Sequence, residues 1–330
     1  MRVLVTGGGG FLGTRICRML QARGEGVVAL GRNPYAHLAQ AGIRTVQADI
    51  RDPDAVRRAC KGVDLVIHSA AMPGIWGSRR LFWDTNVGGT RNVILGCKTC
   101  GVARLIYTSS PSVVFGNRAL AGVDESQPYP SRYLAHYPAS KAAAEQMVLQ
   151  ANGPAFATVA LRPHLIFGPG DPHLFPRIVA RAKAGRLVQV GDGTNRVDVT
   201  YVANAAEAHI RAAEALAVGA PCAGRAYFIS QGEPVVLWPW LNEILAALGL
   251  RAVRRRVSHR TARAVGHCLE ALYRVVGFRA EPPMTRFLAG QLAKPHYFCI
   301  DAARRDLGYR PRVSTDEGVR QLVAWLKDAK

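Results

Sequence analysis

Tyr137 and Lys141 are the two residues of this chain best suited to acid–base chemistry. They lie four positions apart in Tyr137-Pro-Ala-Ser-Lys141, so a helix would carry both side chains on one face. A phenol has an ordinary pKa of about 10 and exchanges protons poorly near neutrality unless a nearby cation stabilises its phenolate. The ammonium group of Lys141 supplies that cation. Alone the pair is a weak signal, because tyrosine and lysine often share a helix surface.

Two polar motifs upstream strengthen this interpretation. Tyr107-Thr-Ser-Ser110 ends a short apolar run that predicts a strand, so its hydroxyl groups would lie where they can reach a substrate carbonyl. Asn86 lies in Thr85-Asn-Val-Gly-Gly-Thr90, near the start of a predicted helix. An amide, a hydroxyl, a phenol and an amine in this order are far more specific than any one of them.

The start of the chain carries a glycine pattern typical of a dinucleotide-binding turn. Val3-Leu4-Val5 predicts a strand, and Gly7, Gly10 and Gly13 follow it at the G-x-x-G-x-x-G spacing, before an amphipathic stretch. Such glycines let the chain turn sharply, bring backbone N–H groups close to a pyrophosphate and pack the next helix on the sheet. The N-terminus of that helix would face the phosphates. The alternative is a glycine-rich strand–helix turn without a ligand.

The end of the second predicted strand bears on which dinucleotide binds. Enzymes that prefer NAD usually place Asp or Glu there, against the ribose 2′-hydroxyl. This chain has Leu30-Gly31-Arg32, which contains no acid and offers a guanidinium suited to a 2′-phosphate. The sequence therefore predicts NADP(H) as the cofactor, with NAD(H) as the weaker alternative.

The elements that would position these residues alternate along the first half of the chain. Strand and helix patterns in alternation predict right-handed βαβ crossovers and a doubly wound parallel sheet of the Rossmann type, in the α/β class. We expect residues 1–165 to form an NAD(P)-binding domain to which the chain returns near 200–230, and residues 166–330 to form a smaller substrate-binding lobe. The predicted strands are 3–6, 27–30, 45–48, 65–68, 105–108 and 158–161, and the predicted helices are 10–23, 54–60, 84–100 and 140–150.

Composition narrows the function classes. With 330 residues, of which 49% are apolar, the chain can bury a large core. No stretch reaches the roughly 18 consecutive apolar residues that span a bilayer, and the N-terminal glycines indicate a cofactor turn rather than a signal peptide. The seven cysteines are scattered, and Cys97-Lys-Thr-Cys100 has no second pair nearby. We therefore expect free thiols in a reducing cytoplasm and no metal site.

The net charge of +20 is the unusual global property of the chain. It favours anionic partners, but the basic residues are dispersed and no nucleic-acid module is recognisable, so nucleic acid is not an expected partner. An arginine bias of a GC-rich genome is the simplest explanation of the charge. The dense run Arg254-Arg255-Arg256 opens the segment 254–278, a basic amphipathic stretch. It would contact an anionic membrane peripherally, cover an apolar pocket or pack on the second lobe.

Together these motifs resemble the extended short-chain dehydrogenase/reductase family, in the branch that contains the 3β-hydroxysteroid dehydrogenases. The resemblance covers nearly the whole chain and rests also on Leu161-Arg-Pro163 and Gly168-Pro-Gly170. It implies a Rossmann fold, a nicotinamide cofactor and reversible conversion of a ketone to an alcohol. By the same resemblance, Asp49-Ile50 would contact the adenine. Further cofactor contacts implied by the family are Phe11, Leu12, Ser69, Ala70, Ala71, Thr108 and Pro163.

The family resemblance also implies a role for each residue of the catalytic group. Tyr137 would donate the proton in reduction and accept it in oxidation, while Lys141 would lower the Tyr137 pKa and hold the nicotinamide ribose. Ser110 would hydrogen-bond the reacting oxygen, and Asn86 would support its helix and a proton-relay water. The segment after Ser110 is one residue longer than in the steroid enzymes. That difference leaves two alternative hydroxyl groups, those of Ser109 and Ser112.

Within this branch the chain is most similar to the 2-alkyl-3-oxoalkanoate reductases of bacterial long-chain olefin and β-lactone biosynthesis. The similarity rests on segments 70–77, 107–113, 161–163, 167–171, 190–193, 227–230 and 303–309. It implies a lipid-like β-keto acid substrate that is reduced to a 2-alkyl-3-hydroxy acid. Other enzymes of the pathway and a second copy of the chain are the expected protein partners. A cation should meet the substrate carboxylate, and the candidates are Arg177, Arg196 and His164.

The sequence leaves two other functions open. The first is a 3β-hydroxysteroid or sterol dehydrogenase, which would use the same residues for oxidation. The second is an NADP-sensing regulatory protein that has kept the fold and lost catalysis. The presence of both Tyr137 and Lys141 argues against the regulator.

Overall fold

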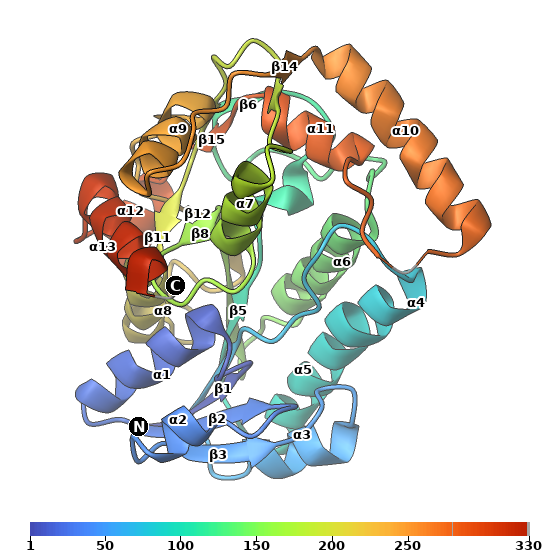
Figure 1. Cartoon of the computed structure of the whole chain (residues 1–330). Helices are drawn as coiled ribbons and strands as arrows, with labels where there is room; N and C mark the ends of the chain where they lie inside the picture. Colours follow the sequence, from blue (N-terminus) through green and yellow to red (C-terminus); the bar gives the residue numbers. More distant parts are fainter. Residues whose placement is uncertain (279, 329–330) are drawn as a thin grey trace.

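One seven-stranded parallel sheet organises the computed structural model, which describes residues 1–278 and 280–328 (Figure 1). The chain winds from β1 outward to β3, returns to the centre and continues from β4 in the other direction. The strand order therefore reverses between β1 and β4, at the crevice where doubly wound sheets bind dinucleotides. This confirms the predicted Rossmann-type α/β class. The order across the sheet is β3 (Arg44–Gln47), β2 (Gly26–Gly31), β1 (Arg2–Thr6), β4 (Leu65–His68), β5 (Arg104–Thr108), β7 (Ala157–Pro163) and β12 (Arg225–Ile229).

Helices cover both faces of this sheet. Alternate residues of a strand point to opposite faces, so Val3 and Val5 pack with α1 (Phe11–Ala22) and α8 (Val202–Ala215), while Leu4 packs with the opposite layer. Strands β4 and β7 are buried at every position, as expected for strands covered on both sides. The opposite layer consists of α3 (Pro53–Cys60), α5 (Gly89–Thr99) and α6 (His136–Gln150).

The remaining elements are short strands and helices, many of which pack around a separate apolar cluster centred on Trp238 and Trp240. The strands pair as β13 (Val235–Val236), β10 (Arg196–Val197), β15 (His296–Phe298) and β6 (Leu120–Val123), as β11 (Thr200–Tyr201) with β8 (Ile166–Phe167), and as β14 (Arg256–Val257) with β9 (Gln189–Val190). The helices are α2 (Ala36–Ala39), α4 (Arg79–Phe82), α7 (Leu174–Lys183), α9 (Leu237–Ala247), α10 (His259–Val276), α11 (Arg286–Ala293), α12 (Asp301–Leu307) and α13 (Thr315–Asp328).

Two helices differ from their predicted bounds in ways that matter for the site. The helix predicted over 84–100 is a π-helical turn, Trp83–Gly88, that runs into α5. Helix α6 begins at His136, four residues before the predicted start, because Pro138 lies in its first turn, where proline is tolerated. Tyr137 is thereby inside the helix. The observed strands match the predicted ones to within two residues, whereas a domain boundary at residue 165 stays a prediction.

Candidate active site

The glycine turn between β1 and α1 leaves no room for side chains. Gly7 has a left-handed backbone (φ 69°), and a Cβ on it would lie 2.8 Å from the backbone nitrogen of Ala70. A Cβ on Gly13 would lie 2.1 Å from the Gly7 carbonyl oxygen, so α1 packs directly on the turn. Gly10 caps α1 without a side-chain acceptor, which leaves the first-turn N–H groups for a ligand. This cradle fits a pyrophosphate, and the helix opens with Phe11, Leu12 and Gly13.

The segment after β4 forms the other wall of the crevice. The backbone N–H of Ser69 donates to the Thr6 carbonyl oxygen (3.2 Å), and that of Ala70 donates to Thr6 Oγ1 (3.2 Å). Ala70 therefore lies directly across from Gly7, with Ala71 next in the chain. Ser69, Ala70 and Ala71, which were predicted to contact the cofactor, thus lie beside the glycine turn.

A buried chain of hydrogen bonds runs behind this wall. Thr90 Oγ1 donates to the Asn86 carbonyl oxygen (2.6 Å) and accepts from His68 Nε2 (3.0 Å), so His68 Nδ1 accepts from the Thr6 hydroxyl (2.6 Å). Burial lowers the His68 pKa to about 3, which keeps the ring neutral. The chain joins β1, β4 and the π-helical turn. Sequence reasoning missed His68, although a histidine ending an apolar strand is a usable signal.

Arg32 and Asp49 lie at the ends of β2 and β3, where the adenosine end of a dinucleotide binds in this fold. Arg32 is exposed. The Asp49 carboxylate is paired with Arg51 (2.7 Å), whose hydrogen bonds lower the Asp49 pKa, and the charge of Arg32 lowers it further. Ile50 is 5% exposed and packs in the core. Arg32 and Asp49 are thus close together, but Asp49 already has a partner.

Tyr35 also lies at this end of the sheet and was missed by sequence reasoning. Its ring packs on Gly9 and Gly31, because a Cβ on either glycine would lie 2.0 Å or less from a Tyr35 atom. The two glycines therefore serve the packing of an aromatic ring beside the cofactor turn.

Ser110 is the serine whose side chain affects the ionisation of the Tyr137 phenol. Burial raises the pKa of the Tyr137 phenol, and a hydrogen bond with the Ser110 side chain lowers it. Ser110 caps the 3₁₀ turn 111–114, where its Oγ accepts from the Ser112 backbone N–H (3.2 Å). The hydroxyl groups of Ser109 and Ser112 are buried and have no partner within the described residues. Of the three candidate serines, Ser110 is the one whose side chain lowers the Tyr137 pKa, and its role toward a substrate stays a prediction.

Lys141 lies one turn further along α6 and is only 2% exposed. Its Nζ donates to the Thr108 carbonyl oxygen (2.6 Å) and lies 4.1 Å from the centroid of the Tyr107 ring. Burial lowers the Lys141 pKa to about 7, against the opposing effect of the Glu145 carboxylate. The Thr108 hydroxyl donates to His209 Nε2 (2.8 Å), since Nδ1 of that ring donates to the Ala205 carbonyl oxygen. Thr108 is therefore fixed between α6 and α8.

A buried ion pair fixes α6 against the end of β7. Arg162 Nη2 donates to Glu145 Oε1 (2.6 Å) and Nε to Oε2 (3.0 Å), with both side chains 3% exposed or less. The Tyr129 hydroxyl donates to the same carboxylate (2.6 Å). Pro163 is the last residue of β7 and is buried. The Leu161-Arg-Pro163 motif thus holds the helix that carries Tyr137 and Lys141.

Asn86 links the loop after β4 to α6. Its Oδ1 accepts from the Met72 backbone N–H (2.7 Å), and its Nδ2 donates to the Met72 carbonyl oxygen (3.2 Å) and to Ser140 Oγ (2.9 Å). The Ser140 hydroxyl donates to the Tyr137 carbonyl oxygen (2.9 Å). These hydrogen bonds show that Asn86 supports α6, whereas a proton-relay water at Asn86 stays a prediction.

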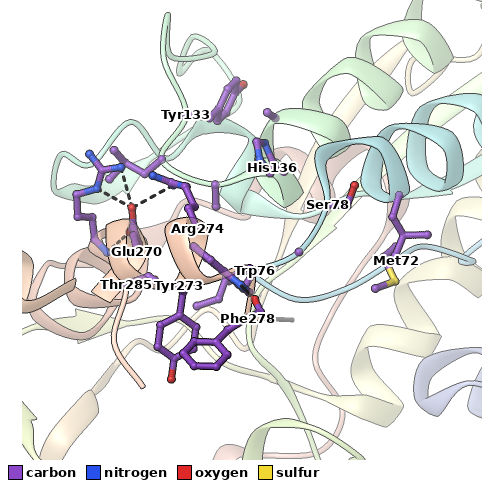
Figure 2. Close-up of a pocket in the computed structure, with 18 residues that line it drawn as sticks. Met72, Trp76, Ser78, Tyr133, His136, Glu270, Tyr273, Arg274, Phe278 and Thr285 are labelled. Atoms are coloured by element: carbon purple, nitrogen blue, oxygen red, sulfur yellow. Dashed lines mark hydrogen bonds and ion pairs between the residues drawn. The ribbon is translucent and has the colours of Figure 1, made fainter. Parts of the chain in front are cut away.

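A cavity of about 970 Å³ opens beside the first turn of α6 (Figure 2). This volume suits a drug-sized or lipid-like molecule. In Figure 2, Tyr273 and Arg274 of α10 face Met72 and Ser78 across the pocket. Its other walls are α4, the start of α11 and residues 133–136, which immediately precede Tyr137.

Trp76 connects the loop wall of the pocket to α10. Its ring meets Tyr273 edge to face (centroids 6.2 Å apart), and the Arg274 guanidinium lies 5.5 Å from its centroid. Its indole N–H donates to the Phe278 carbonyl oxygen (3.4 Å). Helix α10 therefore contacts the loop wall of the pocket through the Trp76 side chain.

One carboxylate and two guanidinium groups lie where α10 meets the start of α11. Glu270, 2% exposed, accepts from the Arg286 backbone N–H (2.7 Å), Nε (2.9 Å) and Nη2 (2.7 Å), and from Arg274 Nη2 at 3.4 Å. Arg286 satisfies the carboxylate, so the positive charge of Arg274 is left largely uncompensated. Burial lowers the pKa of His136, next to Tyr137, and the positive charge of Arg274 lowers it further.

The three cations expected to meet a substrate carboxylate are not among the residues of this pocket. His164 Nε2 lies 2.6 Å from His296 Nδ1, and both rings are buried. Arg177 lies on the surface of α7 and pairs with Glu281 (2.7 Å), and Arg196 is exposed on β10. Burial of His164 and the outward faces of α7 and β10 keep the three side chains away from this pocket, so a contact of any of them with the carboxylate stays a prediction. The pocket is lined by Arg274 and Arg286 instead.

The two cysteines with metal-ligand spacing lie in different surroundings. The Cys97 thiol is buried in the core, whereas Cys100 Sγ is partly exposed and donates to the Arg57 carbonyl oxygen. Across residues 1–278 and 280–328, no group of three or more His, Cys, Asp or Glu side chains could hold a metal ion. Over the same residues, no helix is both long and apolar enough to cross a bilayer.

The arrangement of glycine turn, Asn86, Ser110, Tyr137 and Lys141 agrees with the comparison to known families. Residues 4–258 match the 3-beta hydroxysteroid dehydrogenase/isomerase family. The chain belongs to this family. It is accordingly an NAD(P)-dependent oxidoreductase of the CH–OH/ketone type, in the extended short-chain dehydrogenase/reductase group.

Two similar relatives within the family are 2-alkyl-3-oxoalkanoate reductases. The protein from Stenotrophomonas maltophilia (strain K279a) is 50% identical over 98% of this chain and 99% of its own length. That from Shewanella oneidensis is 47% identical over 98% of this chain and 85% of its own length. The 3 beta-hydroxysteroid dehydrogenase/Delta 5→4-isomerase of Mycobacterium tuberculosis (strain H37Rv) is 35% identical over 98% and 90%.

Solved structures share the architecture over the whole length. The crystal structure of gox2253 superposes with a TM-score of 0.81 at 27% identity and covers 99% of this chain and 98% of its own. MoeE5 in complex with UDP-glucose and NAD gives 0.77 at 25% identity, covering 100% and 99%. The MoeE5 complex contains NAD, which agrees with a nicotinamide site in this family and leaves the choice between NAD and NADP open.

Proposed function

We propose that this enzyme reduces 2-alkyl-3-oxoalkanoates to 2-alkyl-3-hydroxyalkanoates with NADPH, as a step of long-chain olefin and β-lactone biosynthesis. The observation that carries the proposal is a pocket large enough for a branched acyl chain, which opens beside the first turn of the helix that carries Tyr137 and is bordered by Arg274, a residue only partly compensated by Glu270. The identity of 47–50% to two reductases of that name supports the same substrate class.

The proposed mechanism assigns proton transfer to Tyr137. The substrate ketone oxygen accepts hydrogen bonds from the hydroxyl groups of Tyr137 and Ser110, and a bound nicotinamide cofactor supplies the hydride for the carbonyl carbon. Tyr137 then donates its proton to the developing alkoxide, and the Lys141 ammonium stabilises the phenolate that remains. Asn86 and Glu145 act on this step by holding α6 in place.

We propose NADP(H) rather than NAD(H) because of Arg32. The segment after β2, residues 31–33, contains no acid that would bind a ribose 2′-hydroxyl, and Arg32 is exposed there. A guanidinium binds a phosphate with two parallel hydrogen bonds. The glycine turn offers room for the shared pyrophosphate of either cofactor, so only the Arg32 region discriminates between them.

We further propose that Arg274 meets the substrate carboxylate. It borders the pocket and is 58% exposed, and its only ion pair within residues 1–278 and 280–328 is the long one with Glu270. An anionic group in the pocket would balance this charge, whereas a neutral sterol would leave it with only the long contact to Glu270. This difference favours a keto acid over the steroid alternative.

The remaining partners and the location are part of the same proposal. We propose a cytoplasmic enzyme that works as a homodimer or within a complex of the pathway's enzymes, with peripheral membrane contact through residues 254–278. A complex with the other pathway enzymes would pass a long-chain intermediate onward without releasing it into water.

The test is a substrate comparison in the oxidative direction, because β-keto acids decarboxylate spontaneously. NADP⁺ reduction is followed with a synthetic 2-alkyl-3-hydroxy acid, and NAD⁺ reduction with dehydroepiandrosterone as the rival. We expect turnover of the hydroxy acid and little of the steroid. The opposite ranking would assign the enzyme to steroid oxidation.

A further inference from the structure

Trp76 is the residue through which the loop wall of the pocket reaches α10. Its ring meets the Tyr273 ring edge to face, with 6.2 Å between the centroids and 87° between the planes. Its indole N–H donates to the Phe278 carbonyl oxygen (3.4 Å), a contact drawn as a dashed line in Figure 2. Tyr273 in turn meets Phe278 edge to face, with centroids 5.1 Å apart. The three aromatic side chains therefore join the C-terminal end of α10 to the loop.

The backbone of the loop directs Trp76 towards α10. Met72, which precedes Trp76 in this loop, is held by two backbone hydrogen bonds to the Asn86 side chain. Gly74 (φ 108°) and Gly77 (φ 139°) have backbone angles that residues with a side chain rarely adopt. A Cβ on Gly74 would meet no atom of the described residues within 4 Å, so this glycine serves the turn of the chain and not close packing. The direction of Trp76 is therefore set by the loop as well as by its contacts with α10.

Arg274 has few contacts that fix its side chain. Its one ion pair among the described residues is the 3.4 Å contact with Glu270, whereas Arg286 makes shorter hydrogen bonds to the same carboxylate oxygen, at 2.7 and 2.9 Å. An arginine side chain has much rotamer freedom, so one weak ion pair would leave it several conformations. The Arg274 guanidinium also lies over the Trp76 ring, 5.5 Å from its centroid, and a tryptophan face attracts a cation more strongly than other aromatic rings do. The indole face is therefore the surface that keeps this guanidinium at the pocket.

The charge of Arg274 acts on the first turn of α6 across the pocket. His136, the first residue of α6 and the neighbour of Tyr137, lines the same cavity. Burial lowers the pKa of His136, and the positive charges of Arg274 and Arg79 lower it further. The guanidinium that lies over Trp76 is therefore near the end of the cavity that adjoins the proposed proton donor.

We propose that Trp76 is a positioning residue that holds the Arg274 guanidinium at the pocket, where it binds the substrate carboxylate. The indole face restricts the Arg274 side chain, and the loop from Met72 to Gly77 fixes the indole. The preference for an acid over a neutral ketone then depends on two residues from different walls, of which only Arg274 touches the carboxylate. Binding of the carboxylate rests on the proposed function, whereas the hold of Trp76 on Arg274 does not.

A comparison of an acid with its methyl ester tests this role of Trp76. NADP⁺ reduction by a 2-alkyl-3-hydroxy acid and by its methyl ester is measured for Trp76→Leu, which keeps an apolar side chain and removes the ring face. We expect KM for the acid to rise roughly tenfold, as in Arg274→Gln, while kcat and KM for the ester stay nearly unchanged. Trp76→Phe restores an aromatic face and should recover most of the loss. The matched control is Tyr297→Leu, which removes a ring that lies 5.2 Å from Arg196, outside this pocket.

A double-mutant cycle shows whether Trp76 acts through Arg274. In the Arg274→Gln background, Trp76→Leu should raise KM for the acid by about twofold or less, because the group that it positions is absent. A tenfold rise in both backgrounds would contradict the proposal, since Trp76 would then act on the substrate or on the fold independently of Arg274. An equal rise in KM for the acid and the ester in Trp76→Leu would also overturn it.

Titration of His136 by NMR tests the same contact without substrate or cofactor. The chain has nine histidines, so the His136 signal is assigned by its loss in His136→Gln. If Trp76→Leu releases Arg274 into solvent, the His136 pKa should rise towards its value in Arg274→Gln, and it should rise no further in the double variant. Tyr297→Leu should leave it unchanged. A His136 pKa that stays at the wild-type value in Trp76→Leu would overturn the proposal. If the wild type turns over neither the acid nor the ester, the proposed function fails, and this titration still decides the role of Trp76.

Discussion

Asn86 Nδ2 donates to Ser140 Oγ at 2.9 Å, which joins the π-helical turn after α4 to the helix that carries Tyr137. The same side chain binds both backbone groups of Met72, in the loop that forms one wall of the pocket. One buried amide therefore sets the position of the pocket loop relative to the proposed proton donor.

Asn86→Ala should destabilise the protein and lower turnover together. The change leaves the buried Met72 and Ser140 groups unsatisfied, which costs about 1–3 kcal/mol in the free energy of unfolding. Urea unfolding and kcat would be measured side by side. Asn92→Ala, which removes a single amide contact to the Ile50 carbonyl oxygen, is the control and should leave kcat unchanged. A normal kcat in Asn86→Ala would contradict a role for Asn86 in positioning the site.

Arg32→Ala should weaken NADPH much more than NADH. Only NADPH carries the 2′-phosphate, and a hydrogen bond to a charged group contributes about 1.5–3 kcal/mol, which corresponds to roughly tenfold or more in Kd. Cofactor titration by fluorescence gives both constants. Arg51→Ala is the matched control, since Arg51 pairs with Asp49. Equal losses for the two cofactors in Arg32→Ala would show that another residue discriminates between them.

The buried Lys141 predicts a pH dependence of stability. Burial lowers its pKa from 10.5 to about 7 in the folded protein. Between these values the unfolded chain binds a proton that the folded chain lacks, so this contribution to stability falls as the pH is lowered from 10.5 towards 7 and is constant below 7. Lys141→Met removes the titration. The free energy of unfolding of the wild type relative to this variant should therefore rise with pH across that window, and a flat difference would contradict the lowered pKa.

Arg274→Gln should raise KM for a 2-alkyl-3-hydroxy acid by roughly tenfold, because a charge-assisted hydrogen bond is lost. KM for the corresponding methyl ester should change little, since the ester carries no charge. Arg263→Gln removes an exposed arginine from the same helix outside this pocket and serves as the control. An equal rise in KM for the acid and for its methyl ester would mean that Arg274 shapes the pocket without binding the carboxylate.

Local pattern predicted much of the fold and the proposed proton-transfer pair. The strands around Val3 and Leu65 were predicted because buried parallel strands are short apolar runs bounded by turns. Tyr137 and Lys141 were predicted to share a face because a helix repeats every 3.6 residues. The start of α6 was placed four residues late, at residue 140 rather than at His136.

Contacts between distant segments could not be predicted in the same way. Choosing Ser110 over its neighbours required knowing which hydroxyl group meets Tyr137 on another element. Arg274 joins the pocket through Trp76, and the two residues are almost 200 positions apart in the sequence. Arg286, at the start of α11, is fixed by Glu270 of α10, sixteen residues earlier in the sequence. The sequence analysis instead named His164, Arg177 and Arg196 as candidates to bind the substrate carboxylate. Neither periodicity nor spacing indicates which side of their elements faces a substrate.

The central claim, proton transfer by Tyr137, is tested most directly by kcat of the Tyr137→Phe variant. NADP⁺ reduction by a 2-alkyl-3-hydroxy acid is measured beside the Kd for NADPH. Removal of a general acid–base group typically lowers the rate by about 10²–10⁴-fold. We predict a loss of this size, with Kd nearly unchanged because the aromatic ring and its packing on Phe82 are kept. An unchanged kcat would contradict the role given to Tyr137 and with it the proposed mechanism.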